Sequence, residues 1–417
     1  MSKSLSLTEQ LAKHLQRKVD DKTRERARLH LLDWFGCVAG ALGSEVAGVA
    51  RKAGPDVLER VAYLGNELEM DDVHRTAILH PGPVIWPSAL SAIRETQGTM
   101  RDLLDGVVRG YEAMVTVGAT LDSYHYARWH PTGTSGGFGG AAAAASIFHL
   151  NKKQTVWALG NAGSTACGLW HMRHDKVMTK QLHVAHAALE GLWCARTARA
   201  GMTGPAAILE GPQGLYEAMT QKPKPMEFPK RWRIWDVSFK PWGACRHAHP
   251  AIDAALELQQ LLGKFDGEIV VETYADAIVF CDHADPKTPQ QAKFSLQHAV
   301  AIVAERGVPQ LADFEPEAIR KLAKARMRVT VREAKDITAR YPQHYGARVI
   351  CDSETVEMID TLGDPERPMS ETQIIDKAKA LMAWGGLSDK QAKKAVKLAL
   401  EGNNPAAIHN MLGKCLA

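Results

Sequence analysis

The 417-residue chain has no long uninterrupted apolar stretch. Its most apolar segments, residues 31–42 and 136–148, fall short of the roughly 18 uncharged apolar residues that a membrane-spanning helix needs. The first 19 residues have no apolar core of the length found in signal peptides. These absences predict a protein that neither spans a membrane nor is exported.

Charge of one sign is not concentrated anywhere in the chain. The sequence has 51 Lys and Arg against 47 Asp and Glu, a formal net charge of +4, and like charges do not form long runs. This scattering argues against a nucleic-acid partner, although a modest positive excess focused in a cleft suits a small anion. A hydrophobic share of 45% also excludes intrinsic disorder.

Paired cysteines and familiar catalytic signatures are missing as well. The seven cysteines include no C-x-x-C pair and their number is odd, so we expect reduced thiols in a cytoplasmic protein. No P-loop, serine-hydrolase elbow, kinase motif set or H-E-x-x-H motif occurs. The spacing of Gly137, Gly139 and Ala142 resembles a dinucleotide fingerprint, but no predicted strand precedes it.

Apolar periodicity predicts a mainly α fold. Helices are expected over residues 23–42, 88–97, 103–121, 138–150, 154–163 and 183–200, and again from Ser370, where Ser370-Glu371-Thr372-Gln373 has the form of a capping box. Strands are expected over residues 267–280 and 325–332, with 348–351 as a further candidate. We therefore predict a helical domain (1–240), a smaller α/β domain (241–368) and C-terminal helices that return to the first domain (369–417).

Histidine is unusually frequent, with nine of the 17 residues lying between His74 and His186. His80 precedes a proline, which disfavours the helical conformation, so we expect its ring on a loop before a helix that begins near Ser88. Asp71 and Asp72 lie close by and could orient an imidazole or tune its pKa. The alternative is a solvated acidic pair on an ordinary loop.

A second pre-proline histidine, His130, is followed by Thr132 and a glycine-rich lead into a helix. Exposed amides at such a helix start can hold a carboxylate or phosphate. The alternative for residues 136–140 is that glycines only permit close helix packing.

Lys180 stands just before a predicted helix, where a cation is electrostatically disfavoured, and this suggests an anionic ligand. His183 and His186 would share a helix face but lack an acidic third ligand, so we predict no metal site. One of the two is expected to be a packed, hydrogen-bonded core histidine.

The segment from Lys240 to His249 gathers further donors. Arg246, His247 and His249 lie within a few residues of one another at the start of a helix predicted from Ala251. Guanidinium and imidazole groups suit carboxylate binding. Cys245 is expected to be buried rather than nucleophilic.

Taken in order, these motifs resemble the MmgE/PrpD family, which includes 2-methylcitrate dehydratase, cis-aconitate decarboxylase and iminodisuccinate epimerase. The resemblance rests on Asp71-Asp72 with His80-Pro81-Gly82, His130-Pro131-Thr132-Gly133-Thr134, Thr179-Lys180-Gln181-Leu182-His183, Lys240 through Cys245 with His249, and Lys293-Phe294-Ser295-Leu296. It implies a large all-helical domain, a smaller inserted α/β lid, a cleft between them, a homodimer, and no metal or organic cofactor.

The resemblance also implies roles for individual residues. It makes His80, His130, Lys180 and Asp72 catalytic, and Asp71, Thr132, Arg246, His249 and His298 substrate-binding. His298 stands where the decarboxylase and many relatives have tyrosine, so the available acid differs.

The resulting expectation is a lyase acting on a small di- or tricarboxylic acid. Lys180 and Arg246 would hold carboxylates. One of His80 and His130 would remove an α-proton, and the other would protonate the leaving group. Elimination of water is the first expectation, as the family's commonest named activity. Epimerisation through the same carbanion, decarboxylation and a non-catalytic binding relative are the alternatives.

Overall fold

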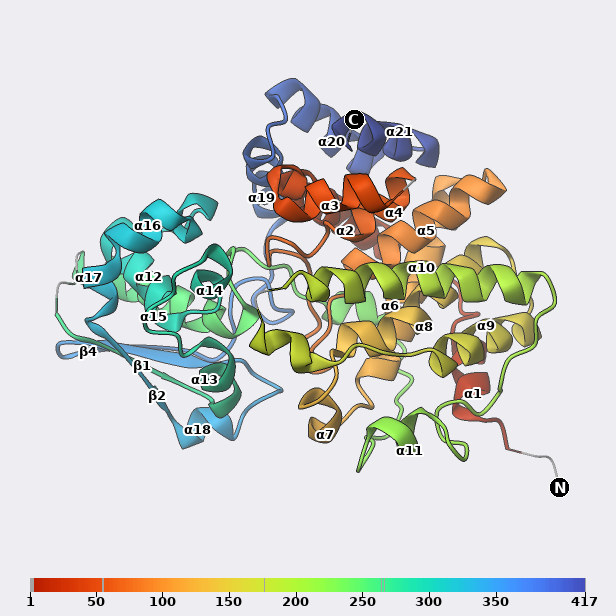
Figure 1. Cartoon of the computed structure of the whole chain (residues 1–417), viewed down its shortest axis with the longest axis horizontal. Coiled ribbons are helices and arrows are strands. Elements are labelled where there is room, and N and C mark those ends of the chain that lie inside the picture. Colours follow the sequence, from red (N-terminus) through yellow and green to blue (C-terminus); the bar gives the residue numbers. More distant parts are fainter. Residues whose placement is uncertain (1–3, 55, 176, 264, 266, 417) are drawn as a thin grey trace. The chain divides into compact units, whose positions relative to one another are not determined.

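The computed structural model describes residues 4–54, 56–175, 177–263, 265 and 267–416. The chain divides into two compact units (Figure 1). Unit 1 comprises Met1–Glu67, Asp71–Val237 and Ser370–Ala417, and unit 2 comprises Leu68–Met70 and Ser238–Met369.

The regular elements in the described part of unit 1 are all helices. They are α1 (Leu7–His14), α2 (Asp21–Gly40), α3 (Glu45–Ala53), α4 (Val57–Ala62), α5 (Gly82–Thr96), α6 (Met100–Gly118), α7 (Ser123–Tyr126), α8 (Pro131–Ile147), α9 (Lys152–Ser164), α10 (Thr179–Arg199), α11 (Leu215–Met219), α19 (Glu371–Trp384), α20 (Asp389–Glu401) and α21 (Pro405–Leu416), with short 3-10 turns η1 (Ala41–Gly43), η2 (Trp170–His174) and η3 (Arg233–Asp236).

Helix α8 lies at the centre of unit 1, packed against α6 on one side and α10 on the other (Figure 1). It consists largely of glycine and alanine and is almost completely buried. Small residues are required here because a Cβ atom on Gly191 of α10 would stand 2.6 Å from the carbonyl oxygen of Gly137. The C-terminal helix α19 lies beside α2, so both ends of the chain contribute to this unit.

Unit 2 is built around a four-stranded sheet with the order β2-β1-β3-β4. Strand β1 (Ile269–Thr273) pairs in parallel with β2 (Val329–Glu333) and antiparallel with β3 (Ala347–Cys351), which pairs antiparallel with β4 (Glu354–Met358). Its helices are α12 (His249–Leu262), α13 (Ala275–Cys281), α14 (Pro289–Lys293), α15 (Leu296–Arg306), α16 (Pro316–Lys321), α17 (Ala323–Arg326) and α18 (Lys335–Thr338), with turns η4 (Arg246–Ala248) and η5 (Leu311–Phe314). Helices α12 and α15 contact the sheet and share its hydrophobic core.

The mainly α fold is confirmed, and so is the capping box at Ser370. The long strand expected over residues 267–280 is wrong in its second half, where β1 ends at Thr273 and α13 follows. The buried residues Tyr274, Ala277 and Cys281 recur at helical rather than alternating spacing. The strand expected at 325–332 begins only at Val329, after the short helix α17.

Several helices begin earlier than the sequence predicts, most of all α5 and α8. Helix α5 begins at Gly82 rather than near Ser88, and α8 begins at Pro131 rather than at Phe138. Proline is tolerated in the first helical turn because the N–H it lacks has no partner there. The glycine-rich segment is therefore part of helix α8 and not a lead into it.

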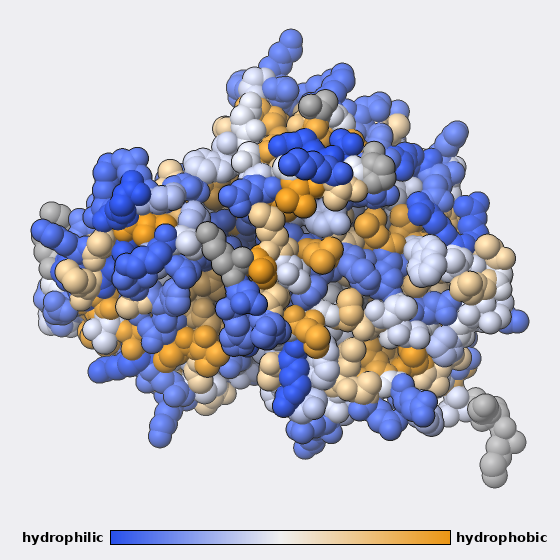
Figure 2. All heavy atoms as spheres, viewed as in Figure 1, coloured by the Kyte–Doolittle hydropathy of each residue, from blue (hydrophilic) through white to orange (hydrophobic). Residues whose placement is uncertain are grey.

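Hydrophobic residues form separate patches among hydrophilic ones on the face shown in Figure 2. A helix both long enough and apolar enough to cross a membrane is not found among the described residues.

Candidate active site

The loop before α5 brings an acidic residue to a histidine. His74 and Leu79 form an isolated antiparallel bridge, so the chain folds back on itself between Asp71 and His80. As a result Asp71 Oδ2 lies 2.8 Å from His80 Nδ1. The carboxylate is buried, whereas the His80 side chain keeps 14% of its surface exposed. A carboxylate at Nδ1 holds the ring in one orientation and leaves Nε2 as the atom available for proton transfer.

Asp72 has different partners from its neighbour. Its Oδ2 atom lies 2.7 Å from His30 Nδ1 and accepts a hydrogen bond of 2.6 Å from the hydroxyl of Tyr111. Its Oδ1 atom accepts the backbone N–H of Gly82 at 2.8 Å, at the start of α5. The sequence predicts that Asp72 orients a histidine, and the histidine that Asp72 contacts is His30.

Burial keeps this inner network in defined protonation states. It lowers the pKa of His30 to about 4, against the opposing effect of the Asp72 hydrogen bond. It also raises the pKa of the Tyr111 hydroxyl well above its ordinary value. At neutral pH a neutral imidazole and a phenol therefore donate to one carboxylate. Because all three side chains are buried, the network fixes the loop rather than meeting solvent.

Thr132 connects the first motif to the second. It lies in the first turn of α8, completely buried, and its hydroxyl oxygen accepts the backbone N–H of His80 at 3.1 Å. This bond places His80 next to the beginning of α8. The oxygen predicted to bind substrate thus has a structural partner, while the hydroxyl proton can still be donated.

His130 is the residue immediately before α8. Its backbone N–H donates to the carbonyl of Gly168 at 2.7 Å, and the adjoining residues Trp129 and Leu169 form a bridge. The ring is almost completely buried, with its centroid 4.7 Å from that of Trp170 and 5.6 Å from that of His183. Backbone pairing and ring contacts together hold this imidazole in place.

Lys180 lies inside the first turn of α10, which begins one residue earlier, at Thr179. His183 is three residues further along and so lies on the same face of the helix. Burial, reinforced by the nearby His186, lowers the pKa of His183 and favours its neutral form. Contacts connect Asp71 to His80, His80 to Thr132, and His130 to His183. Thr132 and His130 both belong to the start of α8, and Lys180 lies one turn from His183. We call these six residues the candidate site.

The remaining predicted site residues belong to unit 2. Arg246 Nη2 lies 2.5 Å from Asp364 Oδ1, and its guanidinium carbon stands 5.3 Å from the centre of the Tyr345 ring. His249 Nε2 lies 3.0 Å from the carbonyl oxygen of Ala244. These contacts give both side chains partners within their own unit. Their predicted role in substrate binding stays a prediction.

His298 is also held inside unit 2. Its Nε2 atom lies 2.8 Å from the carbonyl oxygen of Asp313, which makes Nε2 the protonated nitrogen, and Nδ1 lies 3.3 Å from Arg326 Nη1. Burial lowers the pKa of His298 to about 4. At neutral pH this ring is therefore neutral and already hydrogen-bonded.

Sequence reasoning does not find several participants. His30 and Tyr111 are separated from Asp72 by 42 and 39 positions, so their meeting is visible only in three dimensions. For His30, the one sequence signal is a histidine among the apolar residues that α2 buries. Among the described residues, no group of three or more His, Cys, Asp or Glu side chains is arranged to hold a metal ion.

Two family domains match the sequence over most of its length. Residues 59–227 match the MmgE/PrpD N-terminal domain, and residues 242–402 match the MmgE/PrpD C-terminal domain. This chain belongs to the MmgE/PrpD family. The first domain holds the whole candidate site, and the second corresponds to most of unit 2 and part of the C-terminal helices.

Similar curated proteins of this family are named for one activity. A cis-aconitate decarboxylase-like protein of Aspergillus oryzae is 27% identical over 57% of this chain and 57% of its own length. Cis-aconitate decarboxylase of Aspergillus terreus is 25% identical over 51% of this chain and 47% of its own length. The human cis-aconitate decarboxylase is 27% identical over 43% of this chain and 40% of its own length. The chain spans about half the length of the curated relatives it matches.

Proposed function

We propose that this MmgE/PrpD chain is a lyase that acts on a small di- or tricarboxylic acid by general acid–base catalysis. The observation that carries the proposal is the ion pair between Asp71 and His80, tied through Thr132 to the start of α8 and His130. The family membership and the activity in the relatives' names support the same reaction class.

His80 acts as the base in this scheme. With Asp71 at Nδ1, the Nε2 atom accepts the α-proton of the substrate, and the buried carboxylate stabilises the imidazolium that forms. Removing a proton next to a carboxylate builds negative charge on the carboxylate oxygens. The Lys180 ammonium is the positive group that compensates this charge.

His130 acts as the acid. In an elimination the C–H electron pair becomes the double bond as the C–O bond breaks, and the departing oxygen takes a proton to leave as water. In this scheme His130 supplies that proton, and the hydroxyl of Thr132, two residues further along in the first turn of α8, orients a carboxylate or the leaving group.

Elimination of water remains the first assignment. Decarboxylation is the second candidate, because the curated relatives are named for it. It differs in the bond that breaks. The C–C bond to a carboxylate breaks, carbon dioxide leaves, and the electron pair stays on the substrate as a carbanion, which one of the two histidines protonates. Epimerisation shares proton removal with elimination and ends with reprotonation from the opposite face.

Proton NMR in D₂O distinguishes these reactions on the purified full chain. The substrates are 2-methylcitrate, citrate, cis-aconitate, tartrate and the stereoisomers of iminodisuccinate. A new alkene signal from a saturated substrate indicates dehydration, and loss of a carboxylate with carbon dioxide release indicates decarboxylation. Deuterium at the α-position without net elimination indicates epimerisation. Stabilisation of the chain by one of these acids without any turnover would contradict the lyase proposal and favour a binding relative.

A further inference from the structure

A surface pocket on unit 1 is separate from the residues of the candidate site. It is lined by residues from two segments, 17–23 around the start of α2 and 230–235, and its volume is about 360 Å³. Ligand pockets in proteins usually measure about 300–1,000 Å³, so this one suits a small molecule.

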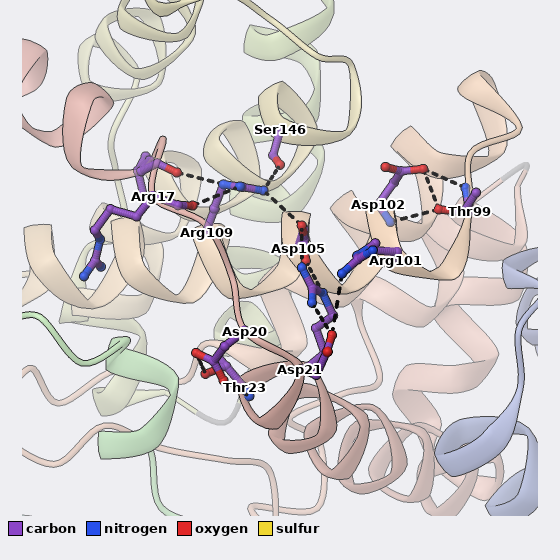
Figure 3. A network of polar contacts seen from close by, with 12 residues as sticks. Arg17, Asp20, Asp21, Thr23, Thr99, Arg101, Asp102, Asp105, Arg109 and Ser146 are labelled. Atoms are coloured by element: carbon purple, nitrogen blue, oxygen red, sulfur yellow. Dashed lines mark hydrogen bonds and ion pairs between the residues drawn. The ribbon is translucent and has the colours of Figure 1, made fainter.

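The lining of this pocket carries a strong excess of positive charge. Its cations are Arg17, Lys18, Lys22, Lys230 and Arg231, and its one acidic side chain is Asp20. The Asp20 carboxylate is turned to the beginning of α2, where it accepts the N–H of Thr23 at 2.8 Å and the Thr23 hydroxyl at 2.9 Å (Figure 3). The Asp20 carboxylate therefore caps the start of α2, and the cations of the pocket outnumber its single acidic group.

Four of the cations are exposed, namely Lys18, Lys22, Lys230 and Arg231. Within the part of the chain that the structure describes, none of the four forms a close ion pair with a carboxylate, and Arg231 interacts with Asp236 only at longer range. Arg17 differs, because its guanidinium lies 3.0 Å from Glu112 and also donates to the carbonyls of Pro229 and Lys230. Arg17 thus ties the two pocket segments together and leaves the other four cations for a ligand.

Trp235 arranges two of these cations. Its indole N–H donates to the Thr23 hydroxyl at 3.2 Å, which fixes the ring against the start of α2. The ammonium of Lys22 lies 5.7 Å from the ring centroid and the guanidinium of Arg231 lies 5.2 Å from it. Both cations are thereby held beside one aromatic ring, in reach of the same space.

We propose that this pocket binds a small anion that carries a pyrophosphate group, either free pyrophosphate or the phosphates of a nucleotide. Several cations around one small space repel one another until a multiply charged anion occupies it. Phosphate oxygens accept charge-assisted hydrogen bonds from lysine and arginine in several directions at once. A pyrophosphate group supplies both the charge and the number of acceptors that four cations require.

Isothermal titration of the full chain with inorganic pyrophosphate, ADP and benzene-1,3,5-tricarboxylate tests this proposal. The tricarboxylate is the matched multiply charged anion without phosphorus. The double variant Lys22→Gln/Lys230→Gln removes two exposed pocket charges. Lys153→Gln is the control variant, since Lys153 also lies over a tryptophan, at 5.0 Å from the centre of the Trp157 ring, but outside the pocket.

Pyrophosphate and ADP should bind the wild-type chain and lose about tenfold or more in affinity with the double variant, because two charge-assisted contacts are removed. The control should bind as the wild type does. Equal affinities for pyrophosphate and ADP assign the contacts to the phosphates alone, whereas tighter ADP binding identifies a nucleotide. Three results would each overturn the proposal. The first is no binding of pyrophosphate or ADP at millimolar concentration, and the second is an unchanged affinity in the double variant. The third is tricarboxylate binding as strong as that of pyrophosphate, if the double variant loses it.

Discussion

At the scale of single residues, the neighbouring carboxylates Asp71 and Asp72 differ in the groups that they contact. Asp71 lies 2.8 Å from the imidazole of His80, whose side chain keeps 14% of its surface exposed. Asp72 accepts a hydrogen bond from Tyr111 and one from the Gly82 amide and contacts His30, all in the interior. In the proposed mechanism Asp71 therefore supports the base His80, whereas Asp72 holds the loop together.

This difference predicts opposite results for two matched variants. Asp71→Asn should lower kcat by about 10²-fold while leaving the free energy of unfolding nearly unchanged, because it weakens the orientation and charge support of His80. Asp72→Asn should instead lower the free energy of unfolding by about 2–4 kcal/mol, because buried donors lose a charged acceptor. Steady-state turnover and urea denaturation of both proteins measure the two effects. A stable, fully active Asp71→Asn protein would refute the role given to Asp71.

The residue types of the candidate site are visible in the sequence, but their pairing is not. A histidine before proline and an adjacent acidic pair mark His80 and Asp71. Which carboxylate of the pair turns toward His80 depends on the fold-back at His74 and Leu79. His30 and Tyr111 come from two other helices, and no local sequence pattern predicts their contact with Asp72.

At the scale of elements, the site depends on how closely α8 and α10 approach. His130 stands at the start of α8 and Lys180 at the start of α10, so the spacing of the two helices sets the spacing of the two side chains. That approach is possible because Gly191 presents no side chain to the backbone of α8.

Gly191→Ala should therefore reduce stability and activity together. The added Cβ would meet the Gly137 carbonyl oxygen at 2.6 Å, a backbone atom that cannot turn aside, and such overpacking costs about 1–3 kcal/mol. Gly48→Ala in α3 is the matched control, because its Cβ would meet nothing within 4 Å. The control should be stabilised by about 0.5–1 kcal/mol, as alanine replaces glycine within a helix. Thermal unfolding that ranks the two variants in the reverse order would contradict this packing account.

Elements with strong periodicity are predictable from the sequence, and their ends are less so. The helix from Asp21 to Gly40 follows apolar spacing that the sequence displays directly. The starts of α5 and α8 are missed because proline and glycine are ambiguous signals that also mark loops. Strand β4 is missed because its residues are mostly exposed and its burial depends on pairing with β3.

At the scale of the whole molecule, the C-terminal helices are joined to the N-terminal ones by a buried ion pair. Lys377 Nζ on α19 lies 2.5 Å from Asp33 Oδ1 on α2. Burial raises the pKa of Asp33 to about 6, and Lys377 opposes that rise. The pair thus keeps a carboxylate charged in the interior of unit 1.

Lys377→Met should lower the free energy of unfolding by about 3–5 kcal/mol, because it leaves a buried carboxylate without its cation. The double variant Lys377→Met/Asp33→Leu should recover much of this loss, since both charges are then absent. Urea denaturation of the three proteins provides the comparison. A single variant as stable as the wild type would show that the two ends of the chain are not coupled by this pair.

Stability of the whole chain should fall in mild acid. Burial lowers the pKa of five histidines to about 3 or 4, namely His30, His74, His125, His247 and His298. Between about pH 6.5 and 4 the unfolded chain binds protons at these residues and the folded chain does not, so each can contribute a loss of up to about 1.4 kcal/mol per pH unit. Asp33 and Glu190, with pKa values raised to about 6 and 7 by burial, act in the opposite sense but are fewer.

Urea unfolding at pH 7, 6 and 5 measures this dependence. The midpoint should move to lower urea as the pH falls. Equal or greater stability at pH 5 would mean that these histidines are protonated in the folded chain.

Turnover by His80→Gln is the decisive test of His80 as the catalytic base. The assay is proton NMR with the acid that the wild type converts, and circular dichroism checks that the variant is folded. His149→Asn is the control, an exposed histidine in a left-handed backbone conformation that asparagine tolerates. We expect the His80→Gln protein to be folded and its kcat to fall by about 10²–10⁴-fold, while the control keeps the wild-type kcat. Near-wild-type turnover by a folded His80→Gln protein would contradict it.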